Sequence, residues 1–494
     1  MSNHYLQHHP VGQAIPHSTH AVCCSLPTLH DVIGYEEKRP ETMAAVRWGY
    51  PRFVQHSYLA RVAAHAAAKL GFADRGVYLL TSPAAAGELE ALLKPKRCQI
   101  REEHDFRVLA TDLDYETTAQ VKAFLQHTGL AISSRQAEDY LIAEGLLSER
   151  FQETSIRNGA EAIAKSMLAR YVATDAMFLS NCGMSAFYAA FKAARAVQRP
   201  RGRKIYLQLG WLYLDTQKIL EQFLAEDETV MTVWDIYATA QIEQIFAKHG
   251  DQLAAVITEA PTNPLLQTLD IPHLSELSRQ AGAVRIFDPT MSSVCNVNLL
   301  PYTDVLVTSL TKYAAHGGDV MIGACAVNPE SSFFSELEAE IALNIVPPYP
   351  RDLERLAVHI QSMPDVVTTL NRNAMQLAEH LEAHPTIKRI HWAYDQRSAA
   401  NYTRIATGEQ CPGCMLTIEL NGAMEHFYDR ARIVKGPSFG TGFTMMCPFM
   451  YLAHYDWVTN PARRKQLYQL GLDPNLLRVS VGTEPIAAII EALG

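Results

Sequence analysis

Short apolar runs alternate with helical segments between about residues 156 and 335, and this alternation restricts the fold more than any other feature of the chain. The runs "LAAVITEAP" at 253–261, "AVRIFD" at 283–288 and "DVLVTSL" at 304–310 predict buried strands. The segment "DIPHLSELSRQAG" at 270–282 lies between the first two runs and predicts a helix. Strands that alternate with helices favour a parallel sheet covered by helices, so we expect an α/β fold.

The helix expected at 270–282 carries its own boundary signals. Asp270 can accept hydrogen bonds as the N-cap, Pro272 suits the first turn, and Gly282 suits the end of the helix. Its expected buried face consists of apolar residues at helical spacing: Ile271, Leu274 and Leu277. The helix therefore separates two strands of one sheet.

Polar residues follow three successive strands of this sheet. They are Glu259 and Asn263, then Asp288 and Thr290, then Ser309, Thr311 and Lys312. In parallel sheets, ligands bind beyond the carboxyl ends of the strands, where these residues are expected to meet. Lys312 alone is either a solvated loop residue or a nucleophile, and strand ends are often merely polar. Complementary groups on three neighbouring strands favour the nucleophile.

A fourth segment, "AMFLSNCGMSAFYAAFKAARAV" at 176–197, predicts a strand, a tight turn at Gly183 and a helix. The unpaired N–H groups of a helix N-terminus can bind a phosphate, and glycine lets the backbone approach it closely. A glycine before a helix is equally typical of a plain turn. Together with the hydroxyls of Ser309 and Thr311, however, this helix start predicts a phosphate cup.

The 494 residues are more than one hydrophobic core usually accommodates, so we expect several domains. We divide the chain into an N-terminal extension at 1–155, a large domain at 156–335 and a smaller C-terminal domain at 336–494. In the extension, "RGVYLLTSPAAAGELEALL" predicts strand, turn and helix. The C-terminal domain is helix-rich at first and then contains strands such as "MLTIEL" and "LLRVSVG".

The composition excludes several classes of protein. A net charge of -9 without a basic block argues against a nucleic-acid partner, and no apolar run is long enough for a membrane span. The polar, histidine-containing N-terminus lacks the apolar core of a signal peptide, so we expect a cytoplasmic protein. That segment reads as a loose or crossing arm, with a metal or partner site as the alternative. We assign no metal ligands.

The nine cysteines are scattered, which indicates reduced thiols. Cys411 and Cys414 form a close pair in "CPGC", which leaves a redox or zinc site open as an alternative. A redox pair normally opens a helix, where the helix dipole lowers the pKa of a thiol. The apolar run "MLTIEL" follows instead and predicts a strand, so we favour a structural role.

Five ordered motifs carry a resemblance to a known family. They are "CGMSA", "EAPTNP", "DPT", "SLTK" and "LLRVSVGTEP". The resemblance extends over about residues 150–494. In order and spacing they are similar to the pyridoxal-phosphate-dependent enzymes of Cys/Met metabolism, such as cystathionine γ-synthase, cystathionine γ-lyase and methionine γ-lyase. "SLPTLHDVIGYEE", "NVNLLPYTDV" and "KGPSFGTGFT" resemble the longer fungal-type cystathionine γ-synthases. The resemblance implies pyridoxal 5'-phosphate as cofactor and a type I fold with a mostly parallel, seven-stranded-type central sheet.

The resemblance also implies roles for the cofactor-binding residues. Lys312 would bind the cofactor covalently and, once substrate releases it, act as the base at the α-carbon. Asp288 would pair with the pyridine nitrogen, which a nearby carboxylate keeps protonated. The remaining expected cofactor ligands are Gly183, Met184, Asn263, Thr290, Ser309 and Thr311, with Tyr213 stacked on the ring.

Four residues are expected on the substrate side. Arg478 lies in "LLRVSVG", where Leu477 and Val479 alternate onto the opposite face, and it suits a bidentate grip on a carboxylate. By resemblance, Asn263 and Ser438 lie near that carboxylate and the lysine. Phe443 is expected at the distal end of the substrate. The Tyr213 phenol could donate a proton to a leaving group.

The sequence departs from the family pattern at several positions. Leu214 and Asp215 replace two glycines after Tyr213, which leaves Trp211 as an alternative stacking residue. "HGGD" at 316–319 replaces "GHSD", and Phe443 replaces a glutamate. The phosphate clamp expected from a partner subunit is not recognisable in "RFQETSIRNG" at 150–159. Phe151 stands where its tyrosine is expected, although Arg157 could still reach a neighbouring chain.

We therefore expect chemistry at the γ-carbon of an amino acid. The fungal-type resemblance favours γ-replacement on an O-acylhomoserine by a thiol. The alternative is a γ-elimination lyase acting on a γ-substituted amino acid, for example a halogenated one, which the missing glutamate supports. A catalytically silent scaffold is the third possibility. The family resemblance implies a homo-oligomer, most plausibly a homotetramer built as a dimer of dimers.

Overall fold

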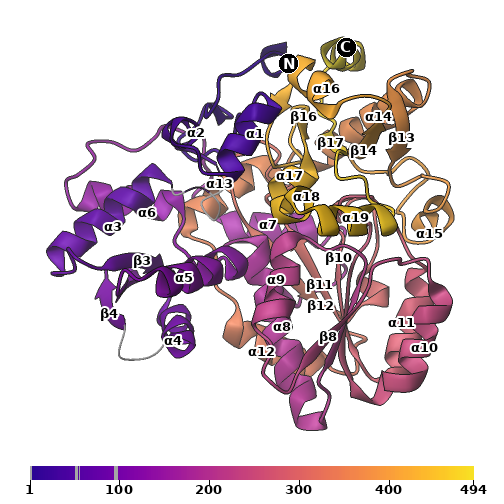
Figure 1. The fold of residues 1–494 in the computed structure, drawn as a ribbon. Coiled ribbons are helices and arrows are strands. Elements are labelled where there is room, and N and C mark those ends of the chain that lie inside the picture. The colour runs from indigo at the N-terminus through magenta and orange to yellow at the C-terminus, as the bar shows by residue number, and fades with distance from the viewer. Residues whose placement is uncertain (1–2, 50–53, 55, 94–97) are drawn as a thin grey trace.

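The computed structural model describes residues 3–49, 54, 56–93 and 98–494 of the chain. Figure 1 shows a central sheet with helices on both faces, a C-terminal domain above it and a smaller N-terminal unit at its side. The two chain ends lie close together on the C-terminal domain. No helix in the described part of the chain is long and apolar enough to cross a membrane.

The central sheet has seven strands in the order β6–β12–β11–β10–β9–β7–β8. The strands are β6 (Met177–Ser180), β7 (Ile205–Leu209), β8 (Thr229–Val233), β9 (Leu253–Glu259), β10 (Val284–Asp288), β11 (Val305–Ser309) and β12 (Gly323–Val327). β12 is antiparallel to both of its neighbours, and the other paired strands run parallel. The mostly parallel α/β sheet expected from the sequence is confirmed.

Helices cover both faces of this sheet (Figure 1). One face packs against α8 (Gly183–Gln198), α9 (Leu214–Gln222) and α12 (Phe334–Asn344), and the other against α10 (Thr239–His249) and α11 (Ile271–Ala281). The predicted helix boundaries at 270–282 are confirmed. Asp270 caps α11 by accepting the N–H of His273, and Gly282 ends it in the left-handed conformation.

The C-terminal domain begins with two long helices, α13 (Pro350–Ile360) and α14 (Met363–Glu382). A five-stranded sheet follows in the order β13–β14–β17–β16–β15. Its strands are β13 (Ile387–His391), β14 (Met415–Leu420), β15 (Val434–Lys435), β16 (Met445–Cys447) and β17 (Leu477–Ser480). The strand predicted from "MLTIEL" is β14, so the CPGC pair precedes a strand and opens no helix.

Residues 57–143 form a compact unit, here called the N-terminal unit. Its antiparallel sheet has the order β3 (Gly76–Leu80), β5 (Phe106–Thr111), β4 (Cys98–Glu103). Its helices are α3 (Ser57–Lys69), α4 (Pro83–Leu92), α5 (Tyr115–Thr128) and α6 (Ser134–Ala143). The strand and helix predicted from "RGVYLLTSPAAAGELEALL" are β3 and α4.

The residues before this unit pack against the C-terminal domain of the same chain. The short strands β1 (Ala14–Ile15) and β2 (Cys23–Cys24) are buried, and α1 (Leu29–Glu36) docks through the N–H of Leu29 on the Asp429 carboxylate, 2.8 Å away. Tyr5 stacks on Phe443 with ring centroids 4.5 Å apart. The described part of this arm is therefore not loose. The 1–155 extension consists of two parts with different packing partners.

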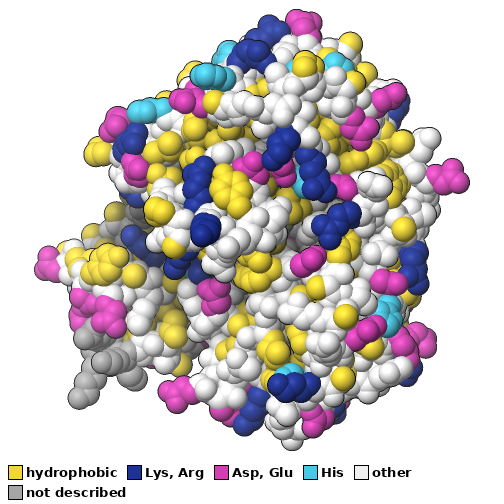
Figure 2. Space-filling view, turned by 45° about the vertical axis from the view of Figure 1, so that its right-hand side comes forward, with side chains coloured by type: hydrophobic (Ala, Val, Ile, Leu, Met, Phe, Trp, Pro, Cys, Tyr) yellow, Lys and Arg dark blue, Asp and Glu magenta, His cyan; other side chains and the backbone are white. Residues whose placement is uncertain are grey.

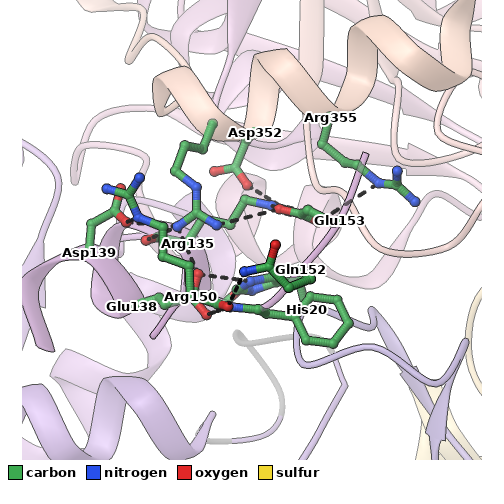
Figure 3. A network of polar contacts seen from close by, with 12 residues as sticks. His20, Arg135, Glu138, Asp139, Arg150, Gln152, Glu153, Asp352 and Arg355 are labelled. Carbon is green, nitrogen blue, oxygen red and sulfur yellow. Dashed lines mark hydrogen bonds and ion pairs between the residues drawn. The ribbon is translucent and has the colours of Figure 1, made fainter. Parts of the chain in front are cut away.

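A buried ion-pair network joins the N-terminal unit to α13 (Figure 3). Arg135, which is 1% exposed on α6, donates two hydrogen bonds to the Glu153 carboxylate and one to Asp352. It also donates to the backbone carbonyl of Asp319 at 3.0 Å. Arg351 adds contacts to Glu138 and Asp139. On the face shown in Figure 2, by contrast, charges of both signs are interspersed.

Candidate active site

The carboxyl ends of β9, β10 and β11 open into one cavity of about 1020 Å³. Seven residues predicted at this edge line it together: Glu259, Asn263, Asp288, Thr290, Ser309, Thr311 and Lys312. The cavity also reaches the start of α8, the start of α9 and strand β17. The predicted convergence of polar groups on one rim of the sheet is therefore confirmed.

Lys312 lies in the connection between β11 and the antiparallel strand β12. Because both strands are paired in the central sheet, this connection is anchored at both ends. Its side chain is buried, with 8% of the residue exposed, and Nζ donates a hydrogen bond to Oγ of Ser438 at 2.9 Å. Nζ also lies 4.9 Å from the centre of the Phe439 ring. A buried amine on the cavity wall contradicts the alternative of a solvated loop lysine.

Two carboxyl groups lie next to each other on the cavity wall, where Glu259 and Asp288 are paired across β9 and β10. Burial raises the pKa of the Glu259 carboxyl well above its usual range, and the nearby charge of Asp288 raises it further. Burial also raises the pKa of Asp288, although the N–H of Thr290 donates to this carboxyl at 2.7 Å. In the described part of the chain, no ion pair compensates the Asp288 charge. A cation facing Asp288 would therefore be stabilised.

The residues expected to form a phosphate cup lie together, at the first turn of α8 and at the end of β11 and just beyond it. A Cβ atom added at Gly183 would lie 2.8 Å from Cβ of Ser309, so only glycine allows this approach. Met184 follows in the helix, and Thr311 is held by the backbone of Ile322. The cup thus offers helix N–H groups and hydroxyls to an anion.

The two candidates for the stacking aromatic residue lie in different surroundings. Tyr213 lines the cavity at the start of α9, and its backbone N–H donates to the Glu259 carboxylate. Trp211 is buried in a separate aromatic cluster with Trp234 and Trp457. The structure therefore favours Tyr213 over Trp211.

Arg478 lies on β17 and lines the same cavity. As predicted from the alternation, its neighbours Leu477 and Val479 belong to the C-terminal hydrophobic core. The guanidinium lies between the rings of Phe439 and Phe449, at 5.0 and 4.7 Å from their centres. Sequence reasoning missed both rings, since "PSFGTGF" and "CPFM" give no sign that they flank a cation.

Phe443 does not line the cavity. Its ring is 3% exposed and stacks on Tyr5 within a cluster that includes Ile15 and Cys23. The expectation that Phe443 contacts the distal part of a substrate is therefore not supported. The N-terminal arm, which lies outside the five motifs that carry the family resemblance, covers this residue.

The altered "HGGD" segment has a packing explanation. A Cβ atom at Gly317 would collide with the ring of His359, so a histidine cannot occupy this position here. His316 instead contacts the Ser362 hydroxyl at 2.9 Å. Of the expected crossing residues, Arg157 is exposed, whereas the Phe151 ring packs edge-on against His20 of the same chain.

The N-terminal unit supplies one wall of the cavity, which sequence reasoning did not predict. The wall is largely apolar and includes Leu59, Ala63, Val77, Leu79 and Leu125, with His127 beside them. Glu36 and Lys38 from the end of α1 also line the cavity. The periodicity of α3, β3 and α5 indicates buried faces, but no pattern in the sequence identifies the large domain as their partner.

These residues fit the expected cofactor. The glycine-bounded cup suits its phosphate, the uncompensated Asp288 carboxylate suits a protonated ring nitrogen, and the Lys312 amine lies on the wall of the same cavity. Arg478 suits the carboxylate of an amino acid. The arrangement can therefore hold a pyridoxal phosphate and an amino-acid substrate side by side.

Comparison with known proteins supports this assignment. A family model described as Cys/Met metabolism PLP-dependent enzyme matches residues 110–494. The chain is 37% identical over 480 residues to L-2-amino-4-chloropent-4-enoate dechlorinase/desaturase of Streptantibioticus cattleyicolor, covering 97% of this chain and 96% of that protein. It is 30% identical over 318 residues to cystathionine γ-synthase of Neurospora crassa, covering 62% of this chain and 49% of that protein.

Solved structures share the fold. Cystathionine γ-lyase of Lactobacillus plantarum, complexed with L-serine, superposes with a TM-score of 0.58 at 20% identity, over 68% of this chain and 85% of that one. Cystathionine γ-synthase of Xanthomonas oryzae gives a TM-score of 0.57 at 19% identity, over 70% and 87%.

Proposed function

Because the chain belongs to the Cys/Met-metabolism family of pyridoxal-phosphate-dependent enzymes, we propose that it eliminates a halide-type substituent from the γ-carbon of an amino acid. Pyridoxal 5'-phosphate is its cofactor. Relatives named as a dechlorinase/desaturase and as a cystathionine γ-synthase both match this chain. The proposal concerns which of the two reactions this chain performs and on what substrate.

The observation that carries the proposal is the composition of the cavity wall. Residues of the N-terminal unit face the same cavity as Lys312 and Arg478, so this unit takes part in substrate recognition. The dechlorinase/desaturase relative matches 97% of the chain and therefore spans this wall as well. The wall is largely apolar, and an unsaturated, chlorinated side chain suits it better than a second charged amino-acid end.

Each side chain has a defined task in this reaction. The bound cofactor supplies an electron sink that acidifies the α-proton of the substrate. Arg478 would bind the α-carboxylate, with Asn263 and the two flanking rings fixing the guanidinium. Asp288 would hold the ring nitrogen in its protonated form.

Proton transfer would fall to two residues. Lys312, placed by its hydrogen bond to Ser438, would remove the α-proton as a free amine and carry protons between neighbouring atoms. Tyr213 faces the cavity from the start of α9 and would contact the departing γ substituent.

A second candidate is γ-replacement by a thiol amino acid. Glu36 favours it, because this carboxyl from the end of α1 lines the cavity and could bind the amino group of an incoming thiol substrate. Burial raises the pKa of Glu36 to about 7, and a bound ammonium group would favour its ionised form. The cystathionine γ-synthase relatives support this reading too.

Incubation of purified enzyme with candidate substrates distinguishes the two reactions. We expect 2-amino-4-chloropent-4-enoate to lose chloride without any thiol, as followed by chloride release and product mass. A Lys312→Ala variant saturated with cofactor should release none. Turnover confined to an O-acylhomoserine in the presence of a thiol would instead identify a γ-synthase.

We further propose that the enzyme is a cytoplasmic homotetramer built as a dimer of dimers. All nine cysteines are unpaired, as expected for a reducing compartment. Light scattering of the holoenzyme at several concentrations tests the assembly. A fully active monomer would contradict it.

A further inference from the structure

A histidine–aspartate pair lies where the N-terminal unit meets the large domain. Nδ1 of His127, in the last turn of α5, is 2.8 Å from Oδ1 of Asp215, in the first turn of α9. His127 is 7% exposed and Asp215 is fully buried. The pair therefore lies inside the molecule. Asp215 is one of the two residues that replace glycines of the family pattern after Tyr213.

The pair leaves one ring nitrogen available to the cavity. Because Nδ1 faces a carboxylate, it carries a hydrogen and donates it. Nε2 has no hydrogen-bonding partner among the residues that the structure describes, although the side chain lines the cavity. When the ring is protonated, Nε2 becomes a charged donor.

Three contacts place this pair beside the phosphate cup. Nδ2 of Asn181 donates to the carbonyl of Gly129, the residue that ends α5, at 2.8 Å, and Sγ of Cys182 lies 3.7 Å from the same carbonyl. On the other side, Oγ1 of Thr216 is 3.8 Å from Sδ of Met184. The ends of α5 and α9 thus flank the first turn of α8.

The phosphate cup itself contains no charged side chain. Gly183, Met184, Ser309 and Thr311 offer neutral donors, whereas a phosphate monoester is largely a dianion at neutral pH. Lys218 and Lys122 also line the cavity, but Lys218 is paired with Glu221 at 2.7 Å, and Lys122 is exposed to solvent, where a charge contact is weaker than at a buried donor. The His127 ring, held by the Asp215 carboxylate, is therefore the side chain at the end of α5 that can add a directed donor to this cup.

We propose that His127, oriented by Asp215, donates its Nε2–H to the cofactor phosphate from within the same chain. The N-terminal unit would then be part of the cofactor site as well as a wall of the substrate cavity. This role rests on the cofactor and not on the elimination reaction. It also gives a physical reason for a carboxylate at position 215, because a glycine there could not orient the imidazole.

Cofactor binding to the apoenzyme tests the role, with pyridoxal 5'-phosphate and pyridoxal as the two probes. Pyridoxal lacks the phosphate. A side chain that contacts the phosphate therefore contributes to the affinity for pyridoxal 5'-phosphate but not to that for pyridoxal. His127→Gln keeps a neutral donor and loses the charge, and charge-assisted hydrogen bonds are about twice as strong as neutral ones. We expect about tenfold weaker binding of pyridoxal phosphate and unchanged binding of pyridoxal.

Two further variants sharpen the result. Lys165→Gln removes a partly exposed cation that does not line the cavity and should change neither dissociation constant. Asp215→Asn keeps an acceptor for Nδ1–H but weakens the hydrogen bond that orients the ring, so it should weaken pyridoxal phosphate binding by a smaller factor than His127→Gln. Equal losses for both probes, or no loss for either, in His127→Gln would overturn the proposal.

A measurement on the wild-type apoenzyme covers the case in which the variants do not fold. Diethyl pyrocarbonate modifies accessible histidine nitrogens, and mass spectrometry locates the modified residue. Pyridoxal phosphate should protect His127 more strongly than pyridoxal at equal occupancy, and equal protection would refute the contact. Because none of these readouts uses turnover, a failed elimination assay leaves the result unaffected.

Discussion

Nη1 of Arg478 donates a hydrogen bond to Oδ1 of Asn263 at 3.0 Å, and this contact joins β17 of the C-terminal domain to the loop after β9 of the large domain. Both residues are buried, at 4% and 2% exposure. The guanidinium is thus positioned by both domains before any substrate arrives. Such preorganisation reduces the entropy lost when a carboxylate binds.

Arg478→Ala should lower kcat/KM for every amino-acid substrate by a factor of roughly 30 or more, because losing one partner of a buried charged pair costs about 2–5 kcal/mol. Cofactor binding should be retained. Steady-state kinetics on two substrates with different side chains provides the check. Arg389→Ala, an exposed arginine of the same domain, serves as the control. A loss confined to one substrate would place Arg478 at the side-chain end instead.

Tyr213→Phe should keep cofactor binding and exchange of the α-proton with solvent but slow the loss of the γ substituent. Removing a positioned proton donor typically costs about 10²-fold in rate or more, whereas the ring remains for stacking. Deuterium incorporation and product release, measured on the same sample, separate the two steps. Tyr237→Phe, whose phenol contacts Ser398 outside the cavity, is the matched control. Loss of exchange would show that Tyr213 acts before the γ-carbon step.

The apoenzyme should become less stable as the pH rises through the folded-state pKa of Asp288. Burial raises this pKa above its unfolded value, so the folded state binds the proton more tightly and loses that stabilisation when the carboxyl ionises. Asp288→Asn removes the group. The wild-type free energy of unfolding, relative to the variant, should therefore fall between about pH 4, the usual pKa of an aspartate, and the folded-state pKa of about 6, and change little above it. Urea denaturation of both apoproteins measures it, and a rise in this difference would contradict the argument.

Phe443→Glu should destabilise the protein without changing the preference among substrates. The carboxylate would be buried in an apolar cluster next to Tyr5, and an uncompensated buried charge costs about 3–5 kcal/mol. Thermal denaturation records the loss, and Phe443→Leu, which keeps an apolar side chain, should lose much less. A stable Phe443→Glu enzyme with altered substrate preference would restore the distal role first expected for this residue.

Local sequence signals were sufficient for the large domain. Asp270 and Gly282 mark the ends of α11 through backbone hydrogen bonds formed within a few residues, so the sequence contains the necessary information. The carboxyl ends of adjacent parallel strands meet by geometry, and Asp288 and Lys312 could therefore be placed on one rim. The orientation of Arg478 followed from the two-residue alternation of a strand.

The missed features depend on contacts between distant segments. His127 meets Asp215 across 88 positions, and the Tyr5 ring covers Phe443 from the other end of the chain. Neither pairing leaves a local periodicity. Phe443 was assigned to the cavity by resemblance alone, and the N-terminal arm, which the core motifs do not include, covers it.

The Arg135 network has a consequence for how the protein fluctuates. Arg135 contacts Asp319, which follows Lys312 in the same connection, and Arg355 and His359 bind the Asp319 carboxylate from α13. If α6, α13 or the lysine connection moved away alone, charged side chains would remain buried without their partners, so local opening is costly. The amide hydrogens of α6 and of the lysine connection should therefore exchange with solvent in one shared, rare event, with similar protection, even in the cofactor-free protein.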